Sequence, residues 1–230
     1  MSMVIKAVFL DEGGTLVDDF ETTYSIFLEL CKEFSLKSVS RKVFAENTLP
    51  ITKLMKIVGL NTDYKGKILE TYMKKAAEKN QQAHFFSDVV AAVKTLKERG
   101  YSLCIVSQQV KSVIEQHLKG VGLNKYFDCI IGFEESPEQK PSPIPIIKAL
   151  ERLGLQPSDA VYCGDMKEDI LAGKAAGVMT IGLAREIGSY DTEVHGSYHT
   201  REMLESARPD KIVSNLLELV NFLDQNARTK

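Results

Sequence analysis

Short apolar runs alternate with amphipathic stretches along most of the chain, and several of the runs end at an acid or a glycine. The first run extends from Val4 to Leu10, is interrupted by Lys6 and stops at Asp11, which Glu-Gly-Gly follows. A run of this length is typical of a buried strand. We therefore predict that Asp11 stands at the carboxyl end of a strand, the edge of an open α/β sheet where ligands bind. The same residues are also common in simple turns, so the motif needs support from the rest of the chain.

The segment after Leu16 has a helical pattern only. No β-rich run interrupts it, and the predicted helices cover residues 20–34, 42–46, 51–58 and 64–79. A block of this size is far longer than the connection between two parallel strands requires. We predict a small inserted α-helical cap domain over residues 17–86, and an α/β core domain formed by residues 1–16 and 87–230.

From residue 87 onward, strand and helix patterns alternate regularly. Predicted strands cover 103–106, 127–131, 160–163, 178–183 and 211–213, and predicted helices cover 88–99, 110–119, 143–153, 169–176 and 215–226. This alternation is typical of right-handed βαβ units, so we predict a doubly wound, parallel, Rossmann-like sheet. Residues 185–208 are rich in Gly, Ser, Tyr and His and are predicted to be irregular.

The amino-acid composition limits the classes of binding partner that we expect. The 29 basic and 31 acidic residues are interspersed, which gives no reason to expect nucleic acid or a membrane as a partner. The N-terminal apolar run is too short for a signal peptide, and no stretch is long enough to span a bilayer, so we expect a cytoplasmic protein. The 4 cysteines form no C-x-x-C pair and are predicted to be buried, reduced thiols. Nothing in the sequence determines the oligomeric state.

Reactive side chains stand at several predicted strand ends. They are Asp11, Ser107, Lys140 in Gln-Lys-Pro-Ser-Pro, and Asp165 with Asp169 in Gly-Asp-Met-Lys-Glu-Asp. Because the carboxyl ends of parallel strands share one edge, we expect these groups to converge. Three neighbouring carboxylates would repel one another unless a cation lay between them, and oxygen-only ligands favour Mg²⁺. Lys140 and Ser107 are suited to binding phosphate oxygens.

The order of these motifs resembles the haloacid dehalogenase superfamily, in its phosphatase and phosphonatase-like branch with a helical cap after the first motif. The resemblance covers nearly the whole chain and is most specific over residues 164–182. It implies that Asp11 attacks phosphorus and forms an aspartyl-phosphate, while Ser107 and Lys140 hold the phosphoryl group. It further implies that Asp11, the carbonyl of Gly13 and Asp165 hold Mg²⁺.

The remaining site residues are less firmly tied to a motif. Asp169 is predicted either to belong to the metal site or to support Lys140. The predicted substrate-binding residues are Gly14, Thr15, Gln108 and Lys53. The substrate class that the resemblance implies is a small phosphorylated metabolite.

One departure from the family pattern bears on activity. Phosphatases of this family carry a second Asp two residues after the nucleophile, which protonates the leaving oxygen, and here that position is Gly13. Glu12 cannot replace it, since neighbouring side chains on an extended segment point to opposite sides. A missing general acid costs a factor on the order of 10² to 10⁴ in rate. Our leading hypothesis is therefore a Mg²⁺-dependent hydrolase with weakened acid catalysis.

The sequence also bears on three other functions. A regulatory protein that binds phosphate without turnover would also account for Gly13. A phosphonatase would form a Schiff base on a cap lysine, for which Lys53 and Lys56 are the candidates, although a solvated helix face is the favoured interpretation for both, since Lys is frequent on surface helices. Dehalogenation is disfavoured, because that branch lacks the metal and the Gly-Asp-x-x-x-Asp motif containing Asp165. The histidines show no metal-binding spacing and are expected at the surface or in satisfied pairs: His84, His117, His195 and His199.

Overall fold

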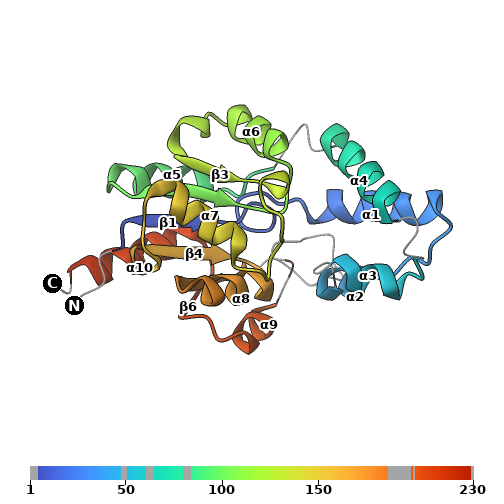
Figure 1. The fold of residues 1–230 in the computed structure, drawn as a ribbon. Coiled ribbons are helices and arrows are strands. Elements are labelled where there is room, and N and C mark those ends of the chain that lie inside the picture. Colours follow the sequence, from blue (N-terminus) through green and yellow to red (C-terminus); the bar gives the residue numbers. More distant parts are fainter. Residues whose placement is uncertain are drawn as a thin grey trace.

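The computed structural model describes residues 5–47, 51–60, 65–79, 84–185, 198 and 200–228. Within these residues, six parallel strands form one sheet in the order β3-β2-β1-β4-β5-β6 (Figure 1). The strands are β1 (Ala7–Leu10), β2 (Ser102–Val106), β3 (Cys129–Ile131), β4 (Ala160–Gly164), β5 (Met179–Leu183) and β6 (Lys211–Val213). The doubly wound parallel sheet predicted from the sequence is confirmed, with the first strand at its centre.

Helices cover both faces of the sheet. Helices α5 (Val89–Glu98), α6 (Lys111–Gly120) and α10 (Leu216–Arg228) contribute to the core on one face, and α7 (Ile144–Leu153) and α8 (Lys167–Ala176) to the core on the other. Successive residues of β1 divide between the two cores, as strand geometry requires: Val8 packs in the first and Phe9 in the second. A strand that is buried on both faces reads as a continuous apolar run, which is why β1 was recognisable in the sequence.

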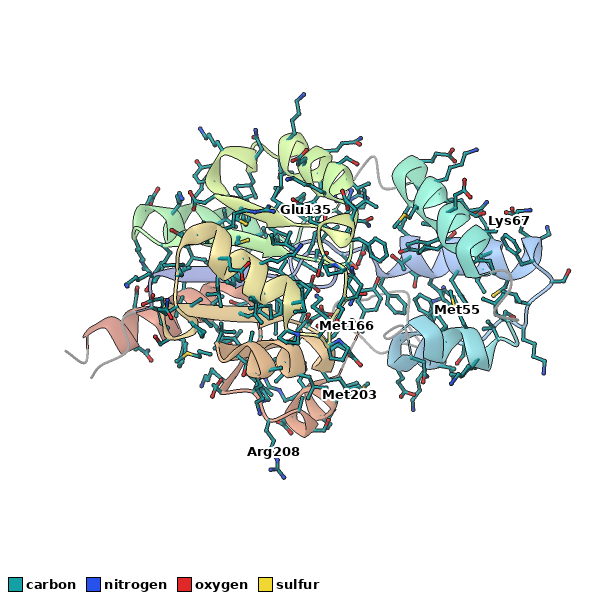
Figure 2. All side chains as sticks on the ribbon, in the orientation of Figure 1. Met55, Lys67, Glu135, Met166, Met203 and Arg208 are labelled. Atoms are coloured by element: carbon teal, nitrogen blue, oxygen red, sulfur yellow. The ribbon has the colours of Figure 1, made fainter. Side chains whose placement is uncertain are left out.

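Four further helices form a separate unit beside the sheet (Figure 1). They are α1 (Phe20–Glu33), α2 (Arg41–Asn47), α3 (Ile51–Ile57) and α4 (Lys65–Lys79). Aromatic side chains hold the unit together: the ring centroids of Phe27 and Phe44 lie 5.0 Å apart. The cluster continues to Met166, at the start of α8, which lies between the sheet and these helices (Figure 2). The helical unit therefore packs directly over the end of β4.

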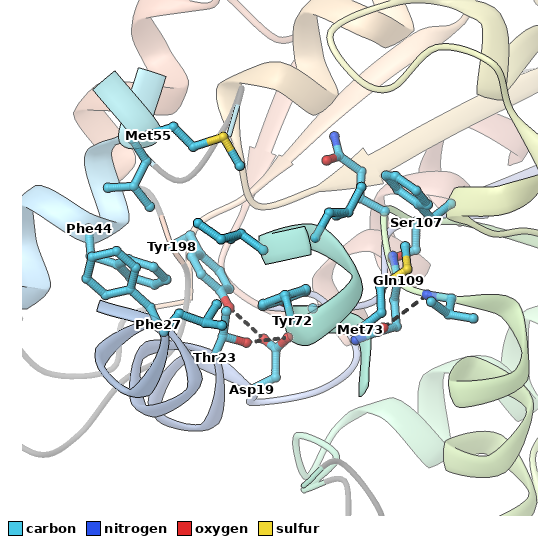
Figure 3. Close-up of a pocket in the computed structure, with 18 of the residues that line it drawn as sticks. Asp19, Thr23, Phe27, Phe44, Met55, Tyr72, Met73, Ser107, Gln109 and Tyr198 are labelled. Atoms are coloured by element: carbon cyan, nitrogen blue, oxygen red, sulfur yellow. Dashed lines mark hydrogen bonds between the residues drawn. The ribbon is translucent and has the colours of Figure 1, made fainter. Parts of the chain in front are cut away.

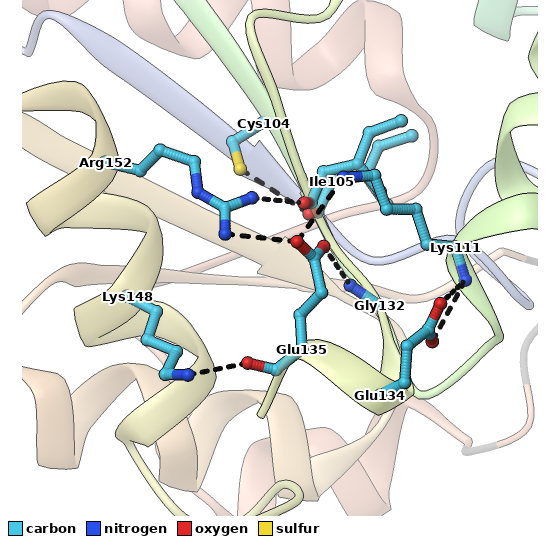
Figure 4. A network of polar contacts seen from close by, with 9 residues as sticks. Cys104, Ile105, Lys111, Gly132, Glu134, Glu135, Lys148 and Arg152 are labelled. Atoms are coloured by element: carbon cyan, nitrogen blue, oxygen red, sulfur yellow. Dashed lines mark hydrogen bonds and ion pairs between the residues drawn. The ribbon is translucent and has the colours of Figure 1, made fainter. Parts of the chain in front are cut away.

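The loop that follows β3 is fixed by a polar network (Figure 4). The Glu135 carboxylate accepts hydrogen bonds from the backbone N–H of Gly132 at 3.3 Å and from Arg152 at 3.1 Å. Lys148 donates to the carbonyl oxygen of Glu135 at 2.7 Å. Because the same loop runs on to Lys140, these contacts help to determine where that lysine enters the site.

Most of the predicted elements agree with the structure within one or two residues, but one helix was missed in the region 185–208, which was predicted to be irregular. It contains α9 (Arg201–Ser206), which begins at Thr200, whose side chain accepts a hydrogen bond from the N–H of Met203 at 3.4 Å. This helix buries Leu204 against Ile170, and its six residues are too few for a recognisable apolar period. Residues 186–197 and 199 lie outside the described part of the chain.

Two smaller expectations can also be compared with the structure. All four cysteines are buried and free, as predicted. Among the helices that the structure describes, none combines the length and the apolar character needed to cross a membrane.

Candidate active site

Three carboxylates meet at the carboxyl edge of the sheet. Asp11 follows β1, Asp165 follows β4, and Asp169 lies in the first turn of α8. One carboxylate oxygen from each lies within 4.8 Å of the others, and all three side chains are buried. The parallel pairing of β1 and β4 produces this arrangement, because the N–H of Asp11 donates to the carbonyl of Cys163 at 3.0 Å. Asp11 and Asp165, which are far apart in the sequence, are thereby brought together, as the strand-end rule predicts.

Lys140 enters the same cluster from the loop after β3. Its Nζ lies 2.9 Å from Oδ1 of Asp11 and 2.6 Å from Oδ1 of Asp169. The second oxygen of Asp169 accepts from the N–H of Met166 at 2.9 Å, and Tyr162 donates to Oδ1 at 3.0 Å. With both of its oxygens engaged by the protein, Asp169 is placed to orient Lys140.

The electrostatics of the cluster are strongly perturbed. Burial raises the pKa of Asp11 to about 7, Lys140 opposes this shift, and Asp169 adds to it. Burial, followed by the charges of Asp169 and Asp11, raises the pKa of Asp165 well above its usual range. The pKa of Lys140 also lies above its ordinary value, because the attraction of Asp11 and Asp169 outweighs the effect of burial. Asp11 and Asp165 are therefore costly to ionise in this environment.

The donor set fits a divalent cation. Three buried carboxylates face a single lysine, so ionisation of all three would leave uncompensated negative charge at the strand ends. Among the described residues, the donors are hard oxygens only, without a histidine or cysteine in the cluster, and this favours Mg²⁺ over zinc. The observed arrangement is therefore compatible with the predicted magnesium site.

Asp165 is oriented by the chain on either side of it. Its Oδ2 accepts from the N–H of Tyr198 at 2.7 Å, and its Oδ1 accepts from the hydroxyl of Thr15 at 3.4 Å. Gly14 adopts a φ of +70°, and a Cβ there would lie 2.3 Å from Oδ2 of Asp165. Gly14 and Thr15 thus pack against Asp165 and are not among the described residues that line the cavity. Their predicted role in substrate binding stays a prediction.

Ser107 and Gln108 lie at the end of β2 and do line the cavity. The hydroxyl oxygen of Ser107 accepts from the N–H of Gln109 at 3.2 Å, while Gln108 donates to the carbonyl of Lys140 at 3.2 Å. Gln108 is thereby held beside the backbone of Lys140. The roles expected for Ser107 and Gln108 in binding phosphate and substrate stay predictions.

The candidate cap lysines and the remaining histidines lie partly outside the described residues. The side chain of Lys53 lies outside the described part of α3, and Lys56 is exposed. His84 is exposed, whereas His195 and His199 are outside the described residues.

Glu12 and His117 form a buried pair, with the carboxylate oxygen of Glu12 2.7 Å from Nδ1 of His117. This agrees with the expectation that Glu12 is not the missing proton donor and that His117 belongs to a satisfied pair.

Sequence reasoning missed Asp19. This residue directly precedes α1, yet its side chain makes no capping hydrogen bond with that helix. It accepts instead from the hydroxyls of Tyr198 at 3.2 Å and Thr23 at 3.4 Å (Figure 3). Burial, together with the charge of Glu12, raises the pKa of Asp19 to about 7. The only sequence signal was an acid before a helix, which ordinarily indicates an N-cap.

A cavity of about 220 Å³ connects the strand ends to the helical unit. Its floor carries Asp11, Ser107 and Lys140. The side chains of Phe27, Phe44, Met55, Tyr72 and Met73 from the helical unit also line it (Figure 3). A ligand bound at the floor would therefore extend between the sheet and the helices.

The fold and the site together define a class of protein: α/β enzymes that carry out their chemistry at the carboxyl edge of a doubly wound sheet, under an inserted helical unit. Residues 8–183 match the family model described as haloacid dehalogenase-like hydrolase. The chain belongs to this family, and it is a hydrolase of the phosphatase branch.

Individual relatives agree with this assignment. The chain is 29% identical over 230 residues to the pyrophosphatase PpaX of Halalkalibacterium halodurans, covering 98% of this chain and 100% of that one. It is 30% identical over 159 residues to phosphoglycolate phosphatase 1 of Pseudomonas aeruginosa, covering 69% of this chain and 54% of that one. A haloacid dehalogenase-like hydrolase from Streptococcus pneumoniae shares the fold, with a TM-score of 0.79 and 24% identity over 95% of this chain and 98% of that one.

Proposed function

We propose that this protein is a Mg²⁺-dependent phosphatase that hydrolyses a small phosphomonoester through an aspartyl-phosphate on Asp11. The observation that carries the proposal is the buried contact of 2.9 Å between Asp11 and Lys140 at the floor of the cavity. A nucleophile beside a fixed positive charge is suited to attack on an anionic phosphoryl group. The relatives named as phosphatases support the same reaction type.

The predicted metal ligands are Asp11, Asp165 and the backbone carbonyl of Gly13. When bound, Mg²⁺ would supply positive charge that lowers the repulsion between substrate phosphate and carboxylates. Asp169, which is paired with Lys140 at 2.6 Å, is proposed to position that lysine instead of binding the metal directly.

The other residues then have simple roles. Lys140 and Ser107 bind phosphoryl oxygens and hold phosphorus in line with the Asp11 carboxylate. Asp11 forms a bond to phosphorus as the ester oxygen leaves, and water later breaks the Asp11–phosphorus bond to release inorganic phosphate. We propose that the helical unit, residues 17–86, acts as a cap that keeps bulk water out of the cavity during the first step.

The test is phosphate release from 4-nitrophenyl phosphate and a panel of phosphorylated metabolites, with Mg²⁺ or with EDTA. Asp11→Asn should abolish turnover, because an amide oxygen is a poor nucleophile. Asp224→Asn on α10 removes a carboxylate from the Arg99 ion pair, far from the cavity, and should leave the rate unchanged. Unaltered turnover in Asp11→Asn would reject the mechanism, and Mg²⁺-dependent binding of phosphate without any turnover would indicate a binding protein.

A further inference from the structure

The part of the cavity formed by the helical unit is mainly apolar, with Asp19, Thr23 and Tyr72 as the polar side chains of its described lining. Its described lining there includes Phe27, Phe44, Leu54, Met55, Ile68 and Met73. Among the described lining residues, Lys140 is the single lysine or arginine, and it lies at the floor. The described walls therefore offer one site for an anionic group, at the strand ends, and an apolar space beyond it.

From this lining we infer that the substrate is a phosphomonoester whose organic part is apolar and about the size of a single ring. This inference rests on the proposed phosphatase function. A second anionic group on the substrate would lose its hydration in the chamber without gaining a cationic partner there. It would also approach the carboxylate of Asp19, which lines the same cavity.

The volume of the cavity agrees with this class of ligand. The cavity measures about 220 Å³, and apolar cavities of about 150 Å³ in other proteins accept benzene. A ring attached to a phosphate ester through one carbon would place the phosphate at Lys140 and the ring among Phe27, Phe44 and Met55 (Figure 3). Apolar surface buried in this way favours binding.

A matched pair of esters tests the inference: benzyl phosphate and 4-carboxybenzyl phosphate differ by one carboxylate. We expect kcat/KM for benzyl phosphate to be higher by about 100-fold or more. Met55→Lys should reduce this ratio by about 10-fold, since it introduces a cation into the wall. Equal or faster hydrolysis of the carboxylated ester, of 2-phosphoglycolate or of pyrophosphate would overturn the inference.

A binding experiment separates this inference from the proposed function. Benzylphosphonate and 4-carboxybenzylphosphonate are not esters, so their affinities for the Asp11→Asn protein can be compared by calorimetry without turnover. Tighter binding of benzylphosphonate by about 10-fold or more supports the apolar substrate class even if no ester is hydrolysed. Equal affinities, or tighter binding of the carboxylated compound, refute it whether or not the protein is a phosphatase.

A second, independent observation concerns the missing proton donor. A Cβ built on Gly13 would lie 2.7 Å from Oδ2 and 3.0 Å from Oδ1 of Asp19. The carboxylate of Asp19 thus occupies the space into which a side chain at position 13 would project. Gly13 leaves this space open, and an Asp at both positions would be excluded by contact and by charge.

The hydrogen bonds of Asp19 hold its carboxylate in this space beside Gly13. An Asp before a helix normally accepts from the first free N–H groups of that helix, yet Asp19 makes no such bond. Its oxygens are held by Tyr198 and Thr23, and the residue lines the cavity next to Asp11 and Gly13 (Figure 3). The side chain therefore lines the cavity and does not cap the backbone of α1.

The geometry points to Asp19 as the catalytic proton donor that replaces the acid absent from position 13. As the bond between phosphorus and the ester oxygen breaks, the Asp19 carboxyl gives its proton to that oxygen and an alcohol leaves. The Asp19 carboxylate then accepts a proton from the water that attacks phosphorus. That attack breaks the bond to Asp11, releases phosphate and restores both carboxyl groups.

The test compares two esters whose leaving groups differ in their need for a proton. For benzyl phosphate, whose alkoxide needs a proton, Asp19→Asn should lower kcat/KM, which reports the steps up to formation of the aspartyl-phosphate, by a factor on the order of 10² to 10⁴. For 2,4-dinitrophenyl phosphate, whose phenolate leaves without one, the loss in kcat/KM should stay below about 10-fold. Asp18→Asn, at the neighbouring acid, which does not line the cavity, is the control.

Moving the acid from position 19 to position 13 distinguishes a catalytic role of Asp19 from a structural one. Gly13→Asp combined with Asp19→Ala should recover at least about 10-fold of the activity that Asp19→Ala loses on benzyl phosphate. Gly13→Asp alone should not raise activity, because its side chain would meet Asp19. Equal losses with both esters in Asp19→Asn, or no loss with either, would overturn the assignment.

Discussion

Replacing Asp165 by Asn should make the metal-free protein more stable and remove its response to Mg²⁺. Oxygens of Asp165, Asp11 and Asp169 lie within 4.8 Å of one another. At this separation and an effective dielectric constant of about 20, each pair of charges repels by about 3.5 kcal/mol. Asp165 faces two such pairs, but its raised pKa means that protonation already relieves much of the repulsion. We therefore expect a net gain of about 2 kcal/mol, or about 4–8 °C in Tm.

The assay is thermal unfolding in EDTA and in Mg²⁺ at pH 8, where the carboxylates are most nearly ionised. Mg²⁺ at about 100 times its Kd should stabilise the wild type by about 2.7 kcal/mol, or about 5–10 °C. Asp165→Asn should show no comparable shift, since it lacks one of the proposed ligands. The control Asp224→Asn should respond as the wild type does. A Mg²⁺ shift of wild-type size in Asp165→Asn, or a lower Tm of its metal-free form, would refute the reasoning.

Three other perturbations probe the same architecture. Gly14→Ala should weaken Mg²⁺ binding by about 10-fold or more, as measured by calorimetry, because the new Cβ would lie 2.3 Å from Oδ2 of Asp165 at a φ of +70°; unchanged affinity would contradict this. The folded-state pKa of Asp19, about 7, exceeds its unfolded value of 3.8. The folded protein therefore holds a proton that the unfolded chain releases, and this contribution to stability is complete below pH 4 and is lost as the pH rises through 7. In EDTA, Tm between pH 5 and pH 8 should accordingly fall less steeply in Asp19→Asn than in the wild type, and identical slopes would be inconsistent with the shift. Arg185→Met leaves Asp88 buried without its partner at 2.8 Å, and urea unfolding should show a loss of about 3 kcal/mol; a change below about 1 kcal/mol would mean that the pair contributes little.

Much of the architecture could be predicted because it depends on local patterns. The apolar run before Asp11 and the repeated strand-helix alternation determine a doubly wound sheet, since each strand is buried on both faces. Parallel topology then brings all carboxyl ends to one edge, so the meeting of Asp11, Lys140 and Asp165 followed from their positions in the chain. Helix α9 escaped prediction because six residues carry too little periodicity.

Only the tertiary structure shows which side chains meet when no pattern in the sequence links them. Asp19 looks like a helix cap in the sequence, yet packing turns it toward Gly13 and Tyr198. The apolar residues of the cap would read the same whether they filled a core or lined a cavity, because periodicity shows which face of a helix is buried and not what covers it. Local sequence therefore determined the sheet and the carboxylates at its edge, whereas long-range packing decided which acid lies beside Gly13 and which side chains line the cavity.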